Sequence, residues 1–198
     1  MINPTGELVA SLASNRKKPP SEDEAPSESL FSRVALHPFL AGMTPAHLAL
    51  LTSCAMATHF RKGQPLLREG EFANRFYLIE SGTVIIESGM ELGDPVVVET
   101  IGSGDLVGWS WMFPPYAWHF TARAAEPVSA LFFYGTVLRE HCEKDPALGF
   151  ELLKRAAAVM LRRMQAARHQ MLAVHSGRTA LMPVVIQPPF MDQENDCD

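Results

Sequence analysis

The 198-residue chain contains little of what several protein classes require. Its three cysteines, Cys54, Cys142 and Cys197, lie far apart and form no CxxC pair, which argues against a disulfide framework, a zinc site or an iron–sulfur cluster. No apolar stretch approaches the roughly 20 residues that span a bilayer, and the N-terminus lacks a signal-peptide pattern. We therefore expect a cytoplasmic protein that does not enter a membrane.

Excess positive charge and catalytic motifs are also missing. The formal net charge is −5, so the chain as a whole does not attract nucleic acid or anionic lipid. No nucleophile with a neighbouring base, no glycine-rich P-loop and no paired catalytic carboxylates can be recognised. The apolar fraction of 47% suffices for one core. These features predict a non-enzymatic protein with one folded domain.

Composition divides the chain into four segments. Residues 1–28 are rich in Ser, Pro, Glu and Lys and are predicted to be a disordered leader. Residues 29–135 are predicted to form the folded domain, and residues 136–177 return to a helical pattern. Residues 178–198 show no periodicity and are predicted to be a tail.

The folded domain is predicted to start with two helices and to continue as a sheet. A first helix begins near Leu30, and a second has Thr44 as its N-cap and ends at about Ala55. Short β-rich runs separated by glycines follow: ATHFR, PLLRE, RFYLIES, TVIIES, PVVVETI, WHFTARAA and VSALFFY. Such runs, at roughly 8–12-residue spacing, predict a closed or double-layered antiparallel sheet, and the interruption LVGWSWMF predicts a short helix.

Two further helices are expected after Gly135. Thr136 is predicted to cap a short one, and Asp145 is predicted to cap a long one that ends near Gly177. Apolar residues spaced alternately by four and three residues follow the long helix, as in the seam of a coiled coil. They are Leu153, Ala157, Met160, Met164, Ala167 and Met171. This seam predicts a homodimer.

The long helix allows a second interpretation. Leu152, Ala156 and Val159 widen the apolar face beyond a strict seam, as expected of a helix that packs on its own domain. The basic residues of the helix are interpreted as its solvated face. They are Lys154, Arg155, Arg162, Arg163 and Arg168.

The stretch FRKGQPLLREGEFANRFYLIESGTVIIE, residues 60–87, places Gly63, Gly70 and Gly82 between strands, where tight corners need a positive φ. In this it resembles the cyclic nucleotide-binding domain family, which includes catabolite-activator-type sensors. The resemblance extends from Val34 to Leu172. It implies a mainly β fold with flanking helices, namely a jelly-roll-like β-roll followed by a long dimerisation helix.

A second stretch, GDLVGWSWMF at residues 104–113, is similar to the phosphate-binding cassette of that family. The resemblance implies that backbone N–H groups at a helix start, around Leu106 to Gly108, hold the phosphate of cyclic AMP or cyclic GMP. Asp105 would take the place of the family's glutamate and accept from a ribose hydroxyl. Alternatively, Asp105 is an N-cap without a ligand. The implied site comprises Gly104, Asp105, Leu106, Val107, Gly108, Trp118, His119 and Thr121.

The arginine that pairs with the phosphate in this family is missing. No Lys or Arg occurs between Asp105 and Arg123, and the expected position falls on Ala117 or Trp118. The loss of such a charge-assisted contact costs roughly a few kcal/mol of affinity, so cyclic nucleotide binding is expected to be weak. His119 is either a poor substitute for the arginine at neutral pH or a structural residue.

Aromatic residues crowd the same loop: Trp109, Trp111, Tyr116, Trp118 and Phe120. They either line a pocket for a flat or apolar ligand or fill the mouth of the roll as extra core. An unknown small ligand is therefore the alternative to a cyclic nucleotide.

The leading functional hypothesis is a ligand-binding regulatory module that acts on an unknown protein partner. The alternative is a protein-interaction scaffold whose pocket has degenerated. A cupin-type metal enzyme is disfavoured because the seven histidines form no HxH pair, and a heme sensor that uses His119 is a minor alternative. The winged helix-turn-helix of the family's transcription factors would follow Leu172, where only a short tail is present, so direct DNA binding is not expected.

Overall fold

The computed structural model describes residues 29–89 and 95–175, so the predicted leader and tail lie outside the described residues. The domain begins with helix α1 (Leu30–Leu36), the short 3-10 helix η1 (Pro38–Leu40) and helix α2 (Pro45–Ser53). Thr44 caps α2 as predicted, and its hydroxyl accepts from the His47 amide at 3.2 Å. Helix α2 ends before the predicted Ala55, because Ala55 already starts the first strand.

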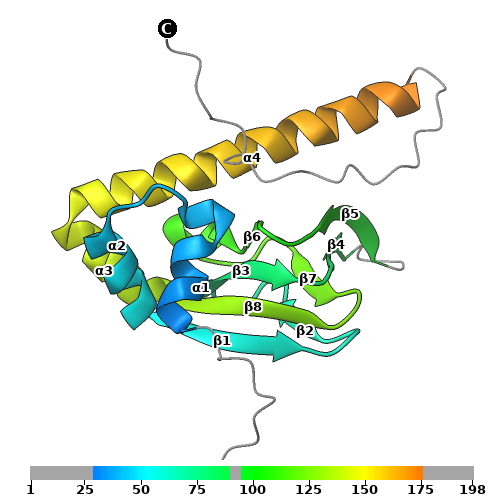
Figure 1. Ribbon diagram of the computed structural model, residues 1–198. Coiled ribbons are helices and arrows are strands. Elements are labelled where there is room, and N and C mark those ends of the chain that lie inside the picture. The colour runs from blue at the N-terminus through cyan, green and yellow to red at the C-terminus, as the bar shows by residue number, and fades with distance from the viewer. Residues whose placement is uncertain (1–28, 90–94, 176–198) are drawn as a thin grey trace, which may run out of the picture.

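Two four-stranded antiparallel sheets form the roll (Figure 1). One sheet has the order β1-β8-β3-β6 and the other the order β2-β7-β4-β5. The strands are β1 (Ala55–Phe60), β2 (Pro65–Leu67), β3 (Arg75–Ser81), β4 (Val84–Ser88), β5 (Val96–Ile101), β6 (Leu106–Val107), β7 (Thr121–Ala124) and β8 (Val128–Tyr134). The predicted double-layered sheet is confirmed.

Aromatic stacking and glycine corners fix the core. The Phe76 ring stacks on Phe133 at 4.7 Å and on Trp111 at 5.4 Å between ring centroids, and all three residues are buried. The glycines at the three predicted corners have φ values of 81°, 82° and 87°. At the last of them, Gly82, a Cβ atom would lie 2.3 Å from the carbonyl oxygen of Pro127, so the corner excludes any larger residue.

Two local predictions were wrong in their boundaries. The run WHFTARAA is not one strand: Trp118, His119 and Phe120 lie in the loop before β7, where the Trp118 amide donates to Glu71 O at 2.9 Å. The interruption LVGWSWMF starts as strand β6, and only Trp109–Met112 form the short 3-10 helix η2. The helix start therefore lies after Gly108, whose φ of 90° ends the strand.

Two helices close the described chain, α3 (Gly135–Lys144) and α4 (Pro146–His175). Thr136 lies inside α3 and not at its N-cap, which is Tyr134, because the chain turns directly from β8 into the helix. Asp145 caps α4 as predicted: its carboxylate accepts from the amides of Ala147 at 3.1 Å and Leu148 at 3.2 Å.

Helix α4 runs along the roll past β6 (Figure 1) and has two different faces. The face toward the roll buries Leu148, Leu152, Arg155, Ala156, Val159 and Arg163. The interpretation that α4 packs on its own domain is therefore correct for this face. The interpretation of Arg155 and Arg163 as solvated was wrong, since they are only 5% and 9% exposed. Leu153, Met164 and Met171 of the predicted seam are exposed. Met160, in contrast, is half-buried and packs against the core of the domain.

Candidate functional site

A hollow of about 530 Å³, open to solvent, lies against the second sheet. Its wall comes from strands β2, β4, β5 and β7, from the turn into η2, from the loop before β7, and from α4. The lining residues are Leu67, Ile86, Val98, Glu99, Val107, Gly108, Trp109, Ser110, Trp118, His119, Phe120, Ala122 and Arg163.

Pairing between neighbouring strands builds the apolar wall of the hollow. Ala122 on β7 pairs with Leu67 on β2 and with Ile86 on β4, so the three side chains neighbour one another. The small Ala122 side chain leaves space that a larger residue would fill. Gly108 packs closely against two lining side chains. A Cβ atom at this position would lie 2.9 Å from Leu67 Cδ1 and 3.1 Å from Trp118 Cζ3.

Trp118 occupies one of the two positions at which the resemblance places an arginine. It is 3% exposed and lines the hollow. Its indole N–H is buried and has no hydrogen-bond partner among the described residues. A buried donor without a partner is costly.

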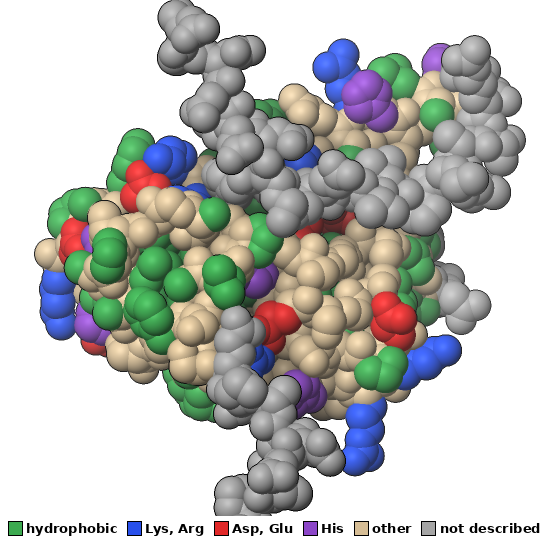
Figure 2. Space-filling view, viewed as in Figure 1, with side chains coloured by type: hydrophobic (Ala, Val, Ile, Leu, Met, Phe, Trp, Pro, Cys, Tyr) green, Lys and Arg blue, Asp and Glu red, His purple; other side chains and the backbone are tan. Residues whose placement is uncertain are grey.

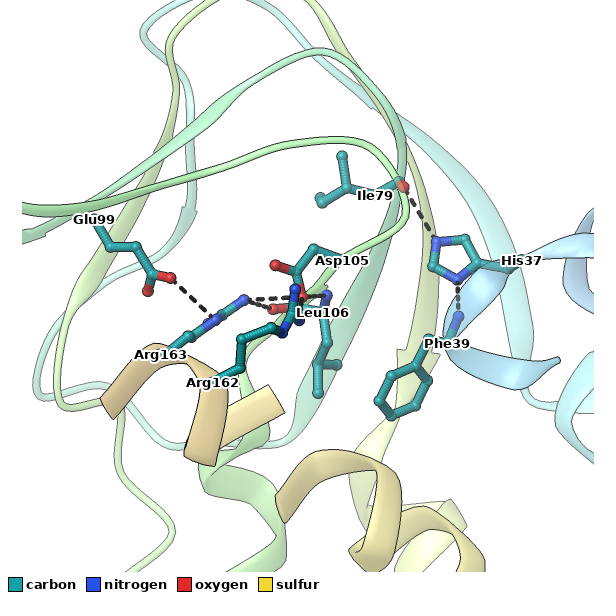
Figure 3. Close-up of polar contacts among 8 residues, drawn as sticks. All are labelled: His37, Phe39, Ile79, Glu99, Asp105, Leu106, Arg162 and Arg163. Carbon is teal, nitrogen blue, oxygen red and sulfur yellow. Dashed lines mark hydrogen bonds and ion pairs between the residues drawn. The ribbon is translucent and has the colours of Figure 1, made fainter. Parts of the chain in front are cut away.

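Asp105 has a different position from the one predicted. It is 4% exposed, does not line the hollow, and points to α4 (Figure 3). Its Oδ1 accepts from the Leu106 amide at 2.8 Å and lies 3.4 Å from Arg162 Nη2 and 3.2 Å from Arg163 Nη2. The Leu106 amide is therefore already bonded and is not the free anion donor that the sequence led us to expect.

Arg163 connects α4 both to the turn at Asp105 and Leu106 and to the hollow. Its Nη2 donates to the Leu106 carbonyl at 2.6 Å, and its guanidinium lies 4.7 Å from the centre of the Trp109 ring. Its Nε forms an ion pair with Glu99 Oε1 at 3.2 Å without hydrogen-bond geometry. Burial raises the pKa of Glu99, and the charge of Arg163 opposes this shift.

His37, between α1 and η1, shares a hydrogen-bond acceptor on β3 with this turn. His37 Nε2 donates to the carbonyl of Ile79 at 3.1 Å, and this carbonyl also accepts from the Gly104 amide at 2.7 Å (Figure 3). Arg155 of α4 donates to the carbonyl of Phe39 at 2.8 Å. Helix α4 thus bonds both to η1, through Arg155, and to the turn, through Arg163.

The structure brings only part of the predicted site together. Val107, Gly108, Trp118 and His119 line the hollow, with His119 exposed at its rim. The other four predicted residues, Gly104, Asp105, Leu106 and Thr121, do not line it. The Thr121 hydroxyl accepts from the Glu69 amide at 3.1 Å. Arg123 donates to Glu87 at 2.9 Å and to the Gly63 carbonyl at 3.0 Å, so it does not replace the missing arginine.

Sequence reasoning missed Glu99 and Arg163. One signal could have indicated Arg163, because it follows Val159 by four residues and so continues the apolar stripe of α4. A basic residue on the buried stripe of an amphipathic helix requires a buried partner. Nothing comparable marks Glu99, which lies on an edge strand among exposed valines.

The described residues also bear on the metal and membrane predictions. Within residues 29–89 and 95–175, no group of three or more His, Cys, Asp or Glu could hold a metal ion, so this part offers no centre of the cupin type. None of the helices found there combines the length and apolar character that crossing a bilayer requires.

Comparison with known proteins agrees with the fold. Residues 57–145 match the family model of the cyclic nucleotide-binding domain. A structure from Geobacter metallireducens, provisionally described as a cyclic nucleotide-binding protein, is 27% identical, with a TM-score of 0.60, and the match covers 67% of this chain and 96% of that one. A search of curated proteins returned no significant match.

Two more distant structures share the fold. The catabolite activator protein of Thermus thermophilus is 20% identical, with a TM-score of 0.55 over 70% of this chain and 63% of that chain. The regulatory subunit of a cAMP-independent protein kinase A from Trypanosoma brucei is 23% identical, with a TM-score of 0.53 over 63% of this chain and 44% of that chain.

Proposed function

We propose, from the match of residues 57–145 to the family model of the cyclic nucleotide-binding domain, that the protein is a non-enzymatic regulatory module of that family. A small ligand occupies the hollow, and its binding changes how α4 lies on the roll. This response reaches a protein partner that the sequence does not identify. The predicted cytoplasmic location is part of the proposal.

One observation carries the proposal: Arg163 belongs to α4, lines the hollow, and also binds the turn at Leu106 and Asp105. A ligand that contacts or displaces this side chain therefore acts on the helix directly. Such a ligand shifts the arrangement of α4 only by the difference between its affinities for the two arrangements. The site and the responding helix share one residue, so no long pathway is needed.

Cyclic AMP and cyclic GMP are weak ligands in this proposal. Arg163 is the one Lys or Arg among the described residues of the hollow, and it is already engaged by two carboxylates. The phosphate would thus lack a free cation. The similar kinase subunit that is described as cAMP-independent supports the view that the roll can serve regulation without this nucleotide.

We further propose that α4 pairs two copies of the chain through Leu153, Ala157, Met160, Met164, Ala167 and Met171. The support is that Leu153, Met164 and Met171 remain 42%, 63% and 73% exposed beside the face that packs on the roll. We expect sedimentation equilibrium to detect a dimer and Met164→Glu to weaken it at least tenfold. The control Gln165→Glu adds the same charge at the exposed neighbouring position and should leave the dimer intact. A wild-type monomer at high concentration would refute the pairing.

A degenerate-pocket scaffold is the second candidate. The pairing of the buried charges supports it, because Arg162 and Arg163 are offset by Glu99 and Asp105 without any ligand. Direct DNA binding is not part of either proposal. On the face that Figure 2 shows, the Lys and Arg side chains of the described residues are scattered and form no continuous basic surface.

A melting experiment with a blocked hollow separates the two candidates. Val98→Trp fills the hollow from half-exposed β5, and the control Val97→Trp adds the same ring at a neighbouring position that does not line it. The wild type should be stabilised by at least one of four compounds, namely cyclic AMP, cyclic GMP, anisole and benzoate, because a ligand that binds only the folded state raises Tm. Val97→Trp should keep this shift and Val98→Trp should lose it. No shift with any compound would contradict the sensor and favour the scaffold.

A further inference from the structure

We propose that a second pocket, separate from the hollow, binds a small carboxylic acid in its anionic form through Arg139. This pocket of about 480 Å³, open to solvent, lies where α3 meets the start of α4 (Figure 1). It is lined by Trp111, Met112, Phe113, Arg139, Cys142, Gly149 and Leu153 and is called the Arg139 pocket below. It shares no lining residue with the hollow, so this inference goes beyond the proposed function and does not depend on it.

The charge of Arg139 has no counter-charge within residues 29–89 and 95–175. The ion pairs found there join other side chains. Nε and Nη2 of Arg139 are buried and have no hydrogen-bond partner in the same part of the chain. The buried arginines of α4, in contrast, contact carbonyls and carboxylates. A guanidinium that is partly withdrawn from water without an anion is costly, so a bound anion would stabilise it.

A ligand in the Arg139 pocket has access to this guanidinium. The Arg139 side chain lines the pocket and is partly exposed. Its third nitrogen, Nη1, is not one of the buried atoms and bonds to no described residue, so Nη1 is the donor that a ligand meets. Cζ of Arg139 lies 3.9 Å from the centre of the Tyr116 ring. This stacking holds the guanidinium plane in place and leaves the in-plane N–H groups free for an acceptor.

The rest of the wall is apolar and uncharged. Apolar side chains form most of it, namely Trp111, Met112, Phe113 and Leu153. Burial raises the pKa of the Cys142 thiol to about 11, so this group carries no charge at neutral pH. None of the described residues that line the pocket is Asp or Glu, whereas Glu99 lines the hollow beside Arg163. A single arginine in an apolar wall suits one carboxylate on an apolar body, because the planar guanidinium matches the carboxylate in shape and charge.

Three probes separate the charge of the ligand from its apolar body. Hexanoate has both, hexanamide is its neutral amide, and acetate lacks most of the body. Dissociation constants are measured by ligand-observed NMR at neutral pH for the wild type, Arg139→Gln, Arg139→Lys, Arg168→Gln and Val98→Trp. Leu153 is also the first residue of the proposed seam, so all measurements use a concentration that keeps the chain monomeric.

We expect the wild type to bind hexanoate about tenfold more tightly than hexanamide, the factor that one charge-assisted hydrogen bond supplies. Acetate should bind at least tenfold more weakly than hexanoate, because it buries less apolar surface. Arg139→Gln should remove the preference for hexanoate over hexanamide, and Arg139→Lys, which keeps the charge, should retain part of it. A wild type without this preference, or an Arg139→Gln variant that keeps it, would overturn the inference.

Two control variants test where hexanoate binds. Arg168→Gln removes a positive charge from an exposed position on α4, and Val98→Trp fills the hollow without touching the Arg139 pocket. Both should bind hexanoate as the wild type does. Loss of binding in Val98→Trp would place the acid in the hollow and overturn the inference.

Cys142 provides a second readout that leaves Arg139 in place. Its half-buried thiol lines the pocket, so saturating hexanoate should slow its reaction with methyl methanethiosulfonate roughly threefold or more. Mass spectrometry of the peptide that contains Cys142 measures this rate, and hexanamide at the same concentration should protect less. Bound hexanoate that leaves the rate unchanged would overturn the inference. The sensor hypothesis would stand in that case, because it depends on ligands of the hollow.

Discussion

The inner and outer faces of α4 differ sharply although they belong to the same turns of helix. Leu152 is 2% exposed and packs on the roll, whereas the next residue, Leu153, is 42% exposed. Arg163 is 9% exposed among carboxylates, whereas the neighbouring Met164 is 63% exposed. The inner face holds the domain together and contacts the hollow, while the outer face is apolar without a partner in the single chain. The proposed function uses both faces, the inner one to respond to the ligand and the outer one to pair with a second copy.

On α4, two arginines are buried while several apolar side chains are exposed, the reverse of the usual distribution. The buried face contains two arginines because their guanidinium groups find carbonyls and carboxylates at the turn and at η1. The exposed face contains methionines, which adapt well to a second surface. Whether a side chain of α4 is buried therefore depends on the partners available around it. The hydropathy of the residue alone does not predict its burial.

The largest effect is expected when the buried ion pairs are broken. Arg163→Gln removes the ion-pair partner of Glu99 and leaves Asp105 with Arg162. It should lower the free energy of unfolding at pH 7 by about 3–5 kcal/mol. Chemical denaturation measures this loss. The control Arg168→Gln removes the same charge from the exposed face and should cost less than about 0.5 kcal/mol. Equal losses for the two variants would mean that the faces do not differ electrostatically.

The same variant has a pH signature. Burial raises the pKa of Glu99, and without Arg163 that pKa should rise further. A carboxyl whose pKa is raised in the folded state destabilises the fold above that pKa, and the penalty falls as the carboxyl takes up its proton. Acidification from pH 7 to pH 5 should therefore recover part of the loss in Arg163→Gln. A loss that does not depend on pH would place the effect elsewhere.

A smaller loss is expected from the apolar contact of the inner face. Leu152→Ala removes a buried side chain and should cost about 2–4 kcal/mol. Leu153→Ala changes the adjacent residue by the same atoms and should cost the monomer at most about 0.5 kcal/mol. Thermal or urea unfolding at a concentration that keeps the chain monomeric measures both. Similar losses at the two positions would refute the assignment of the faces.

The smallest effect is expected from acid, through His37, which lies between α1 and η1 and bonds to β3. Burial lowers the pKa of His37, although the bond to Ile79 and the charges of Glu80 and Asp105 oppose the shift. The unfolded chain therefore takes up this proton first, and stability should fall as the pH drops below about 6.5. His37→Asn should flatten this part of the stability curve. His169→Asn, at an exposed position on α4, should leave the curve unchanged, and the opposite pattern would exclude His37 as the acid-sensitive group.

The sequence predicted the roll well because its signals are local. Positive-φ glycines and β-rich runs located β3 and β8 to the residue, and Thr44 and Asp145 marked helix starts. The site was predicted less well because its parts come from distant elements. Whether Asp105 points to a ligand or to α4 depends on Arg162 and Arg163, about 57 residues later, and no local pattern carries that information. The aromatic loop was similarly ambiguous: Trp118 lines the hollow, whereas Trp111 packs in the core.

The central claim is that occupation of the hollow changes the contact between α4 and the roll, and hydrogen exchange tests it most directly. Backbone exchange along α4 is measured with and without saturating anisole, for the wild type and for Val98→Trp. Our account predicts that anisole changes the protection of the turns around Arg163 in the wild type and has no effect in Val98→Trp. Bound anisole that leaves the exchange of α4 unchanged in the wild type would contradict the account.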